Sequence, residues 1–300
     1  MQAIKLYAPA KLNLYLDVLE KRLDGFHNIK TLFEKIDLLD EIFIRVKGNS
    51  IKVNVIPPTC PGGKDNIVYK AASILLKEAG VDIGLEIDIK KNIPVSAGLG
   101  GGSSDAATAL RSINKILKLG IPEDRLFSIA GSLGKDVPFF MMDYPFAMGS
   151  GTGEILEPLD IGHTLSHVII KPDISISTAE AYERFDDSEK AVDRKDIDKL
   201  ADALKKKDIS LVNENYFNSF EGSLGVYREK VCEIKSLFLN VAHTPGHLSG
   251  SGPSVFCTVT QREKALGISK RLSNETTLDV LVATTYKGGI YGDNRDQDIS

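Results

Sequence analysis

The sequence PVSAGLGGGSSD, from Pro94 to Asp105, contains four glycines, and two serines follow the last of them directly. It lies between an alternating apolar run that ends near Ile89 and a helical pattern that begins near Ser103. Glycines let backbone N–H groups approach an anion closely, and a helix start adds unpaired N–H groups and a positive dipole end. The stretch therefore predicts a strand-to-helix loop that binds phosphate groups, and it suits a nucleoside triphosphate.

Two better-known phosphate loops do not match this stretch. No Gly-Lys-Ser/Thr follows the glycines, as a Walker loop requires, and Ser103 stands where a dinucleotide fingerprint needs its third glycine. A flexible tight turn is the alternative interpretation. The concentration of glycine and serine at a strand-to-helix junction favours the anion site instead.

The first half of the chain places most of its strands before its helices. Alternating apolar residues predict strands, and apolar residues at helical spacing predict helices. This order is typical of an α+β fold and not of a regular βαβ winding. The predicted strands are Leu12–Val18, Ile42–Val46, Ile51–Val55 and Val81–Ile89; the predicted helices are Asn66–Ala79, one capped by Ser103 or Ser104 and reaching Leu117, and one after Pro122.

The second half begins near Ile161 and reads as a small α/β sandwich. We expect domains at residues 1–160 and 161–286, followed by a polar tail at 287–300. The charged stretch from Asp186 to Asp208 is expected to form exposed helix and loop. Predicted strands are His167–Lys171, Val255–Val259 and Leu278–Ala283; predicted helices are Thr178–Phe185, Val231–Phe238 and Glu263–Leu272.

Composition sets wide limits on the class of protein. The 300 residues are 42% hydrophobic and 26% charged, which excludes disordered and fibrous proteins. The net charge of −4 gives no global attraction for nucleic acid or anionic lipid. The longest apolar run, Val137 to Met142, is far shorter than the ~20 residues of a membrane helix.

Cysteine usage and the chain start indicate a compartment. Cys60, Cys232 and Cys257 form no CxxC pair and no disulfide framework, and no secretory or transit signal is visible. We therefore expect a cytoplasmic protein, either a monomer or a homodimer. Its partner is expected to be a small molecule, with neither nucleic acid nor membrane involved.

Two further segments could carry chemistry. Lys11 and Asn13 share one face of the first strand, and Asp136 precedes the apolar run that starts at Val137. A half-buried carboxylate beside a lysine would stay ionised and could accept a proton. A solvated strand face and an exposed turn-capping acid remain the alternatives for these segments taken alone.

The remaining candidates are weaker on their own. A glycine cluster, LSGSGPS from Leu248 to Ser254, could close over phosphate or substrate or form only a turn. His27 follows a predicted turn, and a lone histidine is more often structural than functional. No His/Cys/Asp/Glu group has metal-ligand spacing, and no G-x-S-x-G elbow is present, so zinc sites and serine hydrolases are poorly supported.

Taken together and in this order, the motifs resemble those of the GHMP kinase superfamily. The three superfamily motifs are PAKLN from Pro9, the Pro94 to Ala107 loop, and SGSG from Ser249. The closer similarity is to its members that phosphorylate a cytidine-diphosphate-linked sugar alcohol, whose pattern includes R-x-D-G-[YF]-H from Arg22, DVPFF from Asp136 and a Thr178/Tyr182 element. Phe26 departs from the more common tyrosine and would lose a hydroxyl contact while keeping the ring.

The resemblance implies an ATP-dependent kinase, with Mg²⁺ expected beside ATP, which phosphorylates the 2-hydroxyl of 4-diphosphocytidyl-2-C-methyl-D-erythritol in the non-mevalonate isoprenoid pathway. By the resemblance, Asp136 would be the base and Lys11 would orient the hydroxyl. His27 would read the cytosine edge and Tyr182 would stack on the ring. The implied ATP-binding residues are Pro94, Ala97, Gly98, Leu99, Gly100, Gly101, Gly102, Ser103, Ser104, Lys91 and Asn66; the other implied substrate-binding residues are Asn13, Phe26, Ser249, Gly250 and Ser251.

The resemblance also implies a fold and leaves two rivals. The fold would pair an N-terminal domain like the second domain of ribosomal protein S5 with a C-terminal ferredoxin-like α/β sandwich, and the site would lie between them. One rival is a mevalonate- or homoserine-type GHMP kinase, which the Asp24–His27 segment disfavours. The other is a non-catalytic GHMP-like metabolite-binding protein, which the intact Lys11, Asp136 and glycine loop disfavour.

Overall fold

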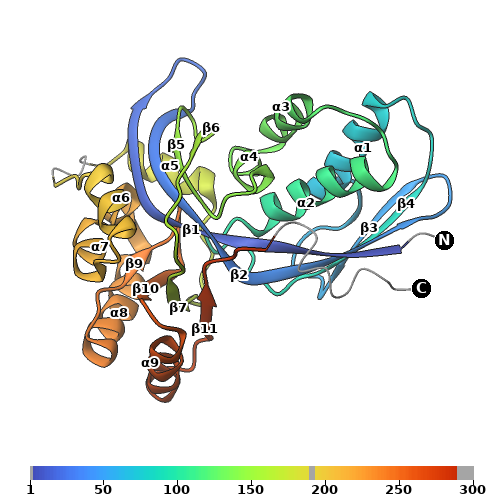
Figure 1. Ribbon diagram of the computed structural model, residues 1–300. Coiled ribbons are helices and arrows are strands. Elements are labelled where there is room, and N and C mark those ends of the chain that lie inside the picture. The colour runs from blue at the N-terminus through green and yellow to red at the C-terminus, as the bar shows by residue number, and fades with distance from the viewer. Residues whose placement is uncertain (1–2, 189–192, 289–300) are drawn as a thin grey trace.

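A long antiparallel hairpin of the first two strands runs through the protein (Figure 1). The computed structural model describes residues 3–188 and 193–288. Strand β1 (Ala3–Lys21) pairs with β2 (His27–Val46) almost end to end, and the turn between them uses Gly25 at a φ of +86°. The pairing register shifts between Pro9 and Ala10 and again between Asn13 and Tyr15. Such bulges redirect side chains, and these two flank Lys11 and Asn13.

The hairpin organises the first sheet. Within the described residues the sheet has seven strands, in the order β3-β4-β2-β1-β8, and β5 joins β2 and β6. Strands β3 and β4 are parallel, so the chain crosses over between them through α1. The other bounds are β3 Ile51–Ile56, β4 Leu85–Lys90, β5 Phe146–Ser150, β6 Ile155–Pro158 and β8 Phe217–Asn218.

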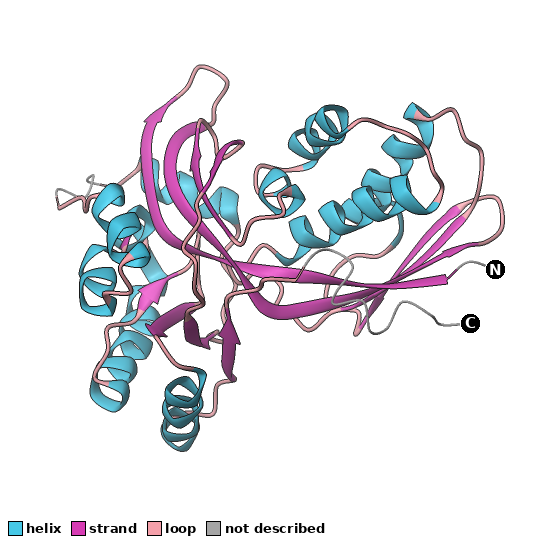
Figure 2. Ribbon diagram, in the orientation of Figure 1, coloured by secondary structure: helices cyan, strands magenta, loops and turns pink. Residues whose placement is uncertain are grey.

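Four helices cover one face of this sheet (Figure 2). Helix α2 lies against β1 and β2, and its alanines Ala106, Ala107 and Ala109 are buried, which lets it approach its neighbours closely. Phe139 of α4 stacks on Phe33 of β2 with ring centroids 4.7 Å apart. The bounds are α1 Ile67–Glu78, α2 Gly101–Ile116, α3 Glu123–Leu133 and α4 Val137–Met141, and a 3-10 turn at Gly63–Asp65 precedes α1.

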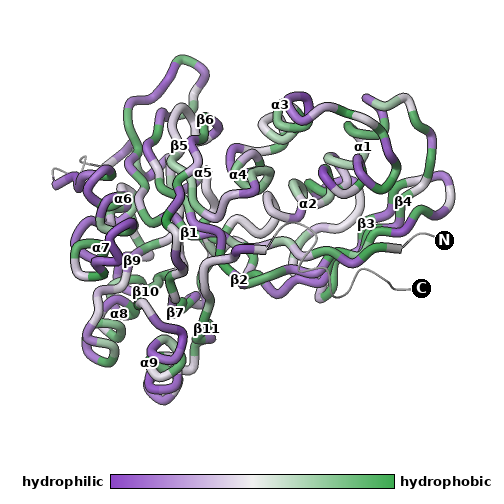
Figure 3. Tube along the Cα trace, viewed as in Figure 1, coloured by the Kyte–Doolittle hydropathy of each residue, from purple (hydrophilic) through white to green (hydrophobic). Residues whose placement is uncertain are grey.

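A second, four-stranded sheet has the order β11-β7-β10-β9. Residues of β7 alternate between two cores: Val168 and Ile170 pack among the residues under α8 and α9, whereas Ile169 faces the hairpin residues Leu12 and Leu14. Figure 3 shows the outer turn of α9 as hydrophilic, away from the hydrophobic segments of β10 and β11. The bounds are β7 Ser166–Ile170, β9 His247–Leu248, β10 Val255–Val259, β11 Val280–Thr284, α5 Thr178–Asp186, α6 Ile197–Lys205, α7 Ile209–Asn215, α8 Arg228–Leu237 and α9 Arg262–Glu275, with short turns at Ser219–Ser223, Gly225–Tyr227 and Phe238–Ala242.

The two halves share core and strands. Strand β8 adds a second-half segment to the first sheet beside β1, and Ile36 forms a β-bridge with Thr285. A buried polar contact also crosses the junction, because His167 Nε2 lies 3.0 Å from Glu34 Oε2 and both side chains are fully buried. The halves are therefore packed through a common core and not joined by a linker alone.

The α+β prediction is confirmed, as are all the predicted helices as elements, but several details were wrong. Gly100 in the left-handed region is the N-cap of α2, not Ser103 or Ser104. Strand β4 begins at Leu85 instead of Val81. The alternation from Leu12 to Val18 predicts a half-buried strand, but Asn13, Tyr15 and Asp17 are as buried as the leucines between them, because the second half covers that face.

Other differences from the predicted elements concern the charged stretch of the second half and several short helices and strands. The charged Asp186–Asp208 stretch contains α6, whose inner face is buried around Leu200 and Leu204, so the stretch is less exposed than predicted. The short elements β5, β6, β8, β9, α4 and α7 were not predicted. Most of the predicted polar tail, at 289–300, lies outside the described residues. In the described part of the chain, no helix is long and apolar enough to cross a membrane.

Candidate active site

A large cavity opens between the glycine loop, the hairpin and the start of the second half. Its volume is about 960 Å³, within the range of small-molecule sites. Residues of β1, of the Pro94–Ser103 loop, of the turn before α4, of α5 and of the Gly250–Ser251 segment line it. These segments are distant in sequence, so the cavity exists only in the folded chain.

The glycine loop forms one wall of the cavity. Gly98 and Gly100 have φ values of +75° and +70°, and Gly100 to Ser103 line the cavity at the start of α2. The first N–H groups of a helix have no acceptor within the helix. Donors of this kind beside a positive helix end suit phosphate oxygens.

Close backbone packing explains two of the glycines. A Cβ atom at Gly98 would lie 2.2 Å from the Ser249 carbonyl oxygen, and one at Gly250 would lie 3.0 Å from the Gly98 carbonyl oxygen. The Ser249 hydroxyl donates to the same Gly98 oxygen at 3.2 Å. The second-half glycine cluster thus packs directly on the phosphate-loop candidate and on Lys11.

Lys11, Asn13 and Asp136 meet at the floor of the cavity. Lys11 Nζ lies 3.6 Å from Asp136 Oδ2 and also donates to Asn13 Oδ1, while Asn13 Nδ2 donates to Thr31 Oγ1 at 2.8 Å. Burial lowers the pKa of Lys11, and the nearby Asp136 carboxylate opposes that shift. The Asp136 side chain is 35% exposed and lines the cavity. A carboxylate held beside an ammonium and open to ligand can accept a proton.

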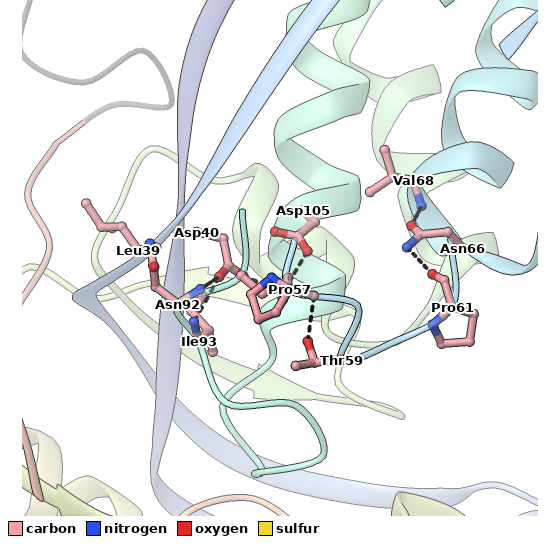
Figure 4. A network of polar contacts seen from close by, with 11 residues as sticks. Leu39, Asp40, Pro57, Thr59, Pro61, Asn66, Val68, Asn92, Ile93 and Asp105 are labelled. Carbon is pink, nitrogen blue, oxygen red and sulfur yellow. Dashed lines mark hydrogen bonds and ion pairs between the residues drawn. The ribbon is translucent and has the colours of Figure 1, made fainter. Parts of the chain in front are cut away.

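A second lysine, Lys91, belongs to a buried cluster under the loop, and Figure 4 shows the two acidic residues of that cluster, Asp40 and Asp105. Lys91 Nζ donates to Asp105 Oδ2 at 2.8 Å and to Asp40 Oδ2. Asp40 Oδ1 accepts from the N–H groups of Asn92 and Ile93 at 2.6 and 2.8 Å. Asp105 Oδ1 has no such partner, and burial together with Asp40 raises the pKa of Asp105. The Lys91 ammonium group therefore already donates hydrogen bonds to two acidic side chains.

Asn66 is committed to the local backbone (Figure 4). It is the N-cap of α1, where its Oδ1 accepts from Val68 N at 2.8 Å, and its Nδ2 donates to the Pro61 carbonyl at 2.7 Å. It lines the cavity together with Cys60 and Pro61. Asn66 therefore stabilises the loop after β3 through both of its side-chain polar atoms, and it also lines the cavity.

Aromatic side chains gather at the other end of the cavity. His27 stacks on Tyr182 with ring centroids 5.2 Å apart, and its Nε2 lies 2.8 Å from Asp186 Oδ1. Burial raises the pKa of the Tyr182 hydroxyl. Phe26 is 51% exposed and lines the cavity. This end therefore offers ring faces from both halves of the chain.

Comparisons with known proteins agree with this geometry. A sequence model described as the GHMP kinases N terminal domain matches residues 66–150. The chain is 37% identical over 279 residues to the 4-diphosphocytidyl-2-C-methyl-D-erythritol kinase of Geobacter metallireducens, covering 92% of this chain and 96% of the relative. It is 37% identical over 291 residues to that of Clostridioides difficile, covering 96% and 97%. The chain belongs to the 4-diphosphocytidyl-2-C-methyl-D-erythritol kinase family.

Solved structures support the same family. The fold is similar to that of a crystallised 4-(cytidine 5'-diphospho)-2C-methyl-D-erythritol kinase, with a TM-score of 0.78 and 29% identity, covering 95% of this chain and 100% of the other. A homoserine kinase from Cytophaga hutchinsonii gives a TM-score of 0.71 at 19% identity, with 95% of each chain covered. That second likeness shows the GHMP fold alone.

The structure brings most of the candidate residues of this family member into one cavity. Ser104 and Ser249 are exceptions, because both are fully buried and neither lines it. Asp40, Asp105, Lys135 and Asp186 were given no role from sequence, and only their long-range contacts reveal them. The candidates that do line the cavity are Lys11, Asn13, Phe26, His27, Asn66, Lys91, Pro94, Ala97, Gly98, Leu99, Gly100, Gly101, Gly102, Ser103, Asp136, Tyr182, Gly250 and Ser251.

Proposed function

We propose that this chain transfers the γ-phosphoryl group of ATP to the 2-hydroxyl of 4-diphosphocytidyl-2-C-methyl-D-erythritol, giving the 2-phosphate and ADP. This reaction is a step in isoprenoid precursor synthesis by the non-mevalonate route. Family membership supports the choice of reaction. The observation that carries the mechanism is the Lys11–Asp136 pair, which opens into the same cavity as the glycine loop.

Phosphoryl transfer depends on positioning and charge stabilisation more than on covalent chemistry. We infer that the backbone N–H groups from Gly100 to Ser103 hold the triphosphate. The substrate oxygen attacks the γ-phosphorus, its proton passes to Asp136, and the bond to the β–γ bridging oxygen breaks to release ADP. Lys11, whose Nζ lies 3.6 Å from Asp136 Oδ2, orients the hydroxyl group toward Asp136.

Magnesium is expected to accompany ATP. In the described part of the chain, no group of three or more His, Cys, Asp or Glu residues could cage a metal ion. Mg²⁺ usually takes one or two protein carboxylates together with substrate phosphates and water. The hydroxyl of the cavity-lining Ser103 fits that donor set beside the ATP phosphates, while Asp136 serves as the base. Ser103 would help to hold the ion, whose charge would stabilise the transferring phosphoryl group.

The cytosine is proposed to lie at the aromatic end of the cavity. Phe26 presents an exposed ring, and the stacked pair of His27 and Tyr182 presents a second aromatic surface. His27 Nε2 is engaged with Asp186, so reading of the base edge would use the other ring nitrogen or an exchange of partner. We also propose the domain division at residues 1–160 and 161–286, although the two parts share core residues.

The decisive experiment measures ADP release from ATP with three alcohols in parallel. These are the cytidine-diphosphate-linked methylerythritol, mevalonate and homoserine. We expect turnover with the first alone. Turnover with mevalonate or homoserine instead would assign another GHMP kinase activity. No ADP release with any of them, but a thermal shift on adding the first, would indicate a non-catalytic binding protein.

A further inference from the structure

The cavity has an uneven balance of charge. Among the described residues that line it, the basic side chains are Lys11, Lys21, Lys91 and Lys135. Lys11 pairs with Asp136, Lys21 with Asp186, and Lys91 with both Asp40 and Asp105. No carboxylate within the described part of the chain lies within ion-pair distance of Lys135, although its charge adds to the hydrogen bonds from Thr152 that lower the pKa of Glu154 against the effect of burial. Three of the four cations are thus already neutralised, while the proposed ligands are strongly anionic.

Lys135 occupies a connecting position in the cavity. It lies in the turn between α3 and α4, directly before Asp136 in the chain. Its Nζ lies 4.7 Å from the centroid of the exposed Phe26 ring. The residue is half-buried, which weakens screening of its charge without closing it off from a ligand. One end of this side chain therefore adjoins the proposed base, and the other adjoins the proposed cytosine site.

The chemistry of the proposed substrate matches that position. In a cytidine-diphosphate-linked alcohol, the diphosphate is the segment that joins the nucleoside to the alcohol. With the cytosine near Phe26 and the reacting hydroxyl near Asp136, the diphosphate has to pass close to Lys135. A cation that lies over an aromatic ring and has no carboxylate at ion-pair distance can exchange the ring contact for a charge-assisted hydrogen bond to phosphate, which is stronger.

Resting on the proposed function, we propose that Lys135 binds the diphosphate of the cytidine diphosphate group. It is a substrate-binding residue that selects diphosphate-linked alcohols, and it takes no part in proton transfer. The Phe26 ring keeps the ammonium group beside the cavity until substrate arrives.

The test compares binding of cytidine, CMP and CDP to the wild type and to Lys135→Gln, Lys135→Arg and Lys270→Ala by calorimetry. Lys270 is an exposed lysine of α9 and does not line the cavity, so its variant is the matched control. We expect Lys135→Gln to weaken CDP binding about 10-fold, the scale of one charge-assisted hydrogen bond, and to leave cytidine binding unchanged. Lys135→Arg should keep most of the CDP affinity, and Lys270→Ala should keep all of it.

Kinetics on the same proteins complete the test. Lys135→Gln should raise KM for the diphosphate-linked alcohol by about the same factor while leaving kcat and KM for ATP near wild-type values. An equal loss for cytidine and CDP would overturn the proposal, because the effect would then run through the Phe26 ring. Unchanged CDP affinity, or a larger loss for ATP, would also overturn it.

The inference and the proposed function fail in different ways. If the wild-type protein binds CDP but does not phosphorylate the alcohol, the proposed function is refuted. The affinities for cytidine, CMP and CDP still test whether Lys135 binds the diphosphate. A wild type that does phosphorylate the alcohol, with a Lys135→Gln variant of normal CDP affinity, refutes the inference alone. A wild type that binds no CDP refutes both. Melting curves confirm that each variant is folded.

Discussion

At the scale of single residues, one carboxylate should separate chemistry from binding. Asp136 lies 3.6 Å from Lys11 and faces the cavity, so it can accept the proton of the attacking hydroxyl. Asp136→Asn should lower kcat by about 10²–10⁴-fold, because an amide cannot act as the base. ATP affinity and melting temperature should change little. Steady-state kinetics and nucleotide binding measure the two effects separately.

Asp82→Asn is the control for that prediction, because Asp82 is exposed and does not line the cavity. Its kcat should equal that of the wild type. An Asp136→Asn enzyme with unchanged kcat would remove Asp136 from the mechanism.

Gly98 tests the packing of the two glycine loops. Gly98→Ala would place a Cβ atom 2.2 Å from the Ser249 carbonyl oxygen, at a backbone φ of +75° that L residues avoid. We expect a loss of about 2 kcal/mol or more in the free energy of unfolding, together with weaker ATP binding. Gly131→Ala in α3 meets no neighbour within 4 Å and should stabilise the fold by about 0.5–1 kcal/mol. Urea unfolding of the two variants compares them, and equal stability would contradict the prediction.

At the scale of elements, a buried cluster fixes the start of α2 to the first sheet. Lys91 bonds Asp105 of α2 and Asp40 of β2, and a Cβ at Gly101 would lie 3.2 Å from its Nζ. Lys91→Met should cost about 3–5 kcal/mol of stability, because the buried Asp40 carboxylate loses its counter-ion and the buried Asp105 carboxyl group loses a hydrogen-bond donor. It should also raise KM for ATP through displacement of the loop. Lys90→Met, next in the chain but exposed, should change stability by about 1 kcal/mol or less.

The same cluster predicts a pH dependence of stability. The folded-state pKa of Asp105 is raised above its ordinary value of 3.8, chiefly by burial. Between those two pKa values the folded chain keeps a proton that the unfolded chain has released, so stability falls as the pH rises through this window. Asp105→Asn has no such proton, and its free energy of unfolding should fall less between about pH 5 and about pH 8. Parallel pH profiles for wild type and variant would contradict the assignment.

At the scale of the whole molecule, a buried contact joins the two halves. Glu34 of β2 meets His167 of β7 and accepts from the Thr285 hydroxyl at 2.6 Å, and His167 Nδ1 lies 3.0 Å from Thr258 Oγ1. Glu34→Leu or His167→Leu alone should cost about 3–5 kcal/mol, because each removes the group that faces a buried polar atom, His167 Nε2 or Glu34 Oε2. The double variant should cost clearly less than the sum.

Urea unfolding followed by far-ultraviolet circular dichroism measures this coupling, since the chain has no tryptophan to report by fluorescence. Neither residue lines the cavity, so the folded variants should retain activity. Additive losses would show that the two side chains act independently.

The sequence by itself predicted the features that depend on neighbours in the chain. The glycine loop, the face shared by Lys11 and Asn13, and the helix after Asn66 follow from backbone freedom and periodicity, which are local properties. The motif order then led to the family and to the α+β class. The role of the loop in phosphate binding stays a prediction.

Tertiary structure decided which polar groups meet. Lys91 bonds Asp40, which lies 51 residues away in the sequence, and Glu34 of one sheet contacts His167 of the other. No local sequence pattern predicts either contact. Burial made the difference: a charge removed from water needs a partner, and only the packed fold brings that partner within reach. The same packing buried the polar face of β1 and, among the described residues, left Lys135 without a carboxylate at ion-pair distance, which is the basis of the diphosphate site that we propose.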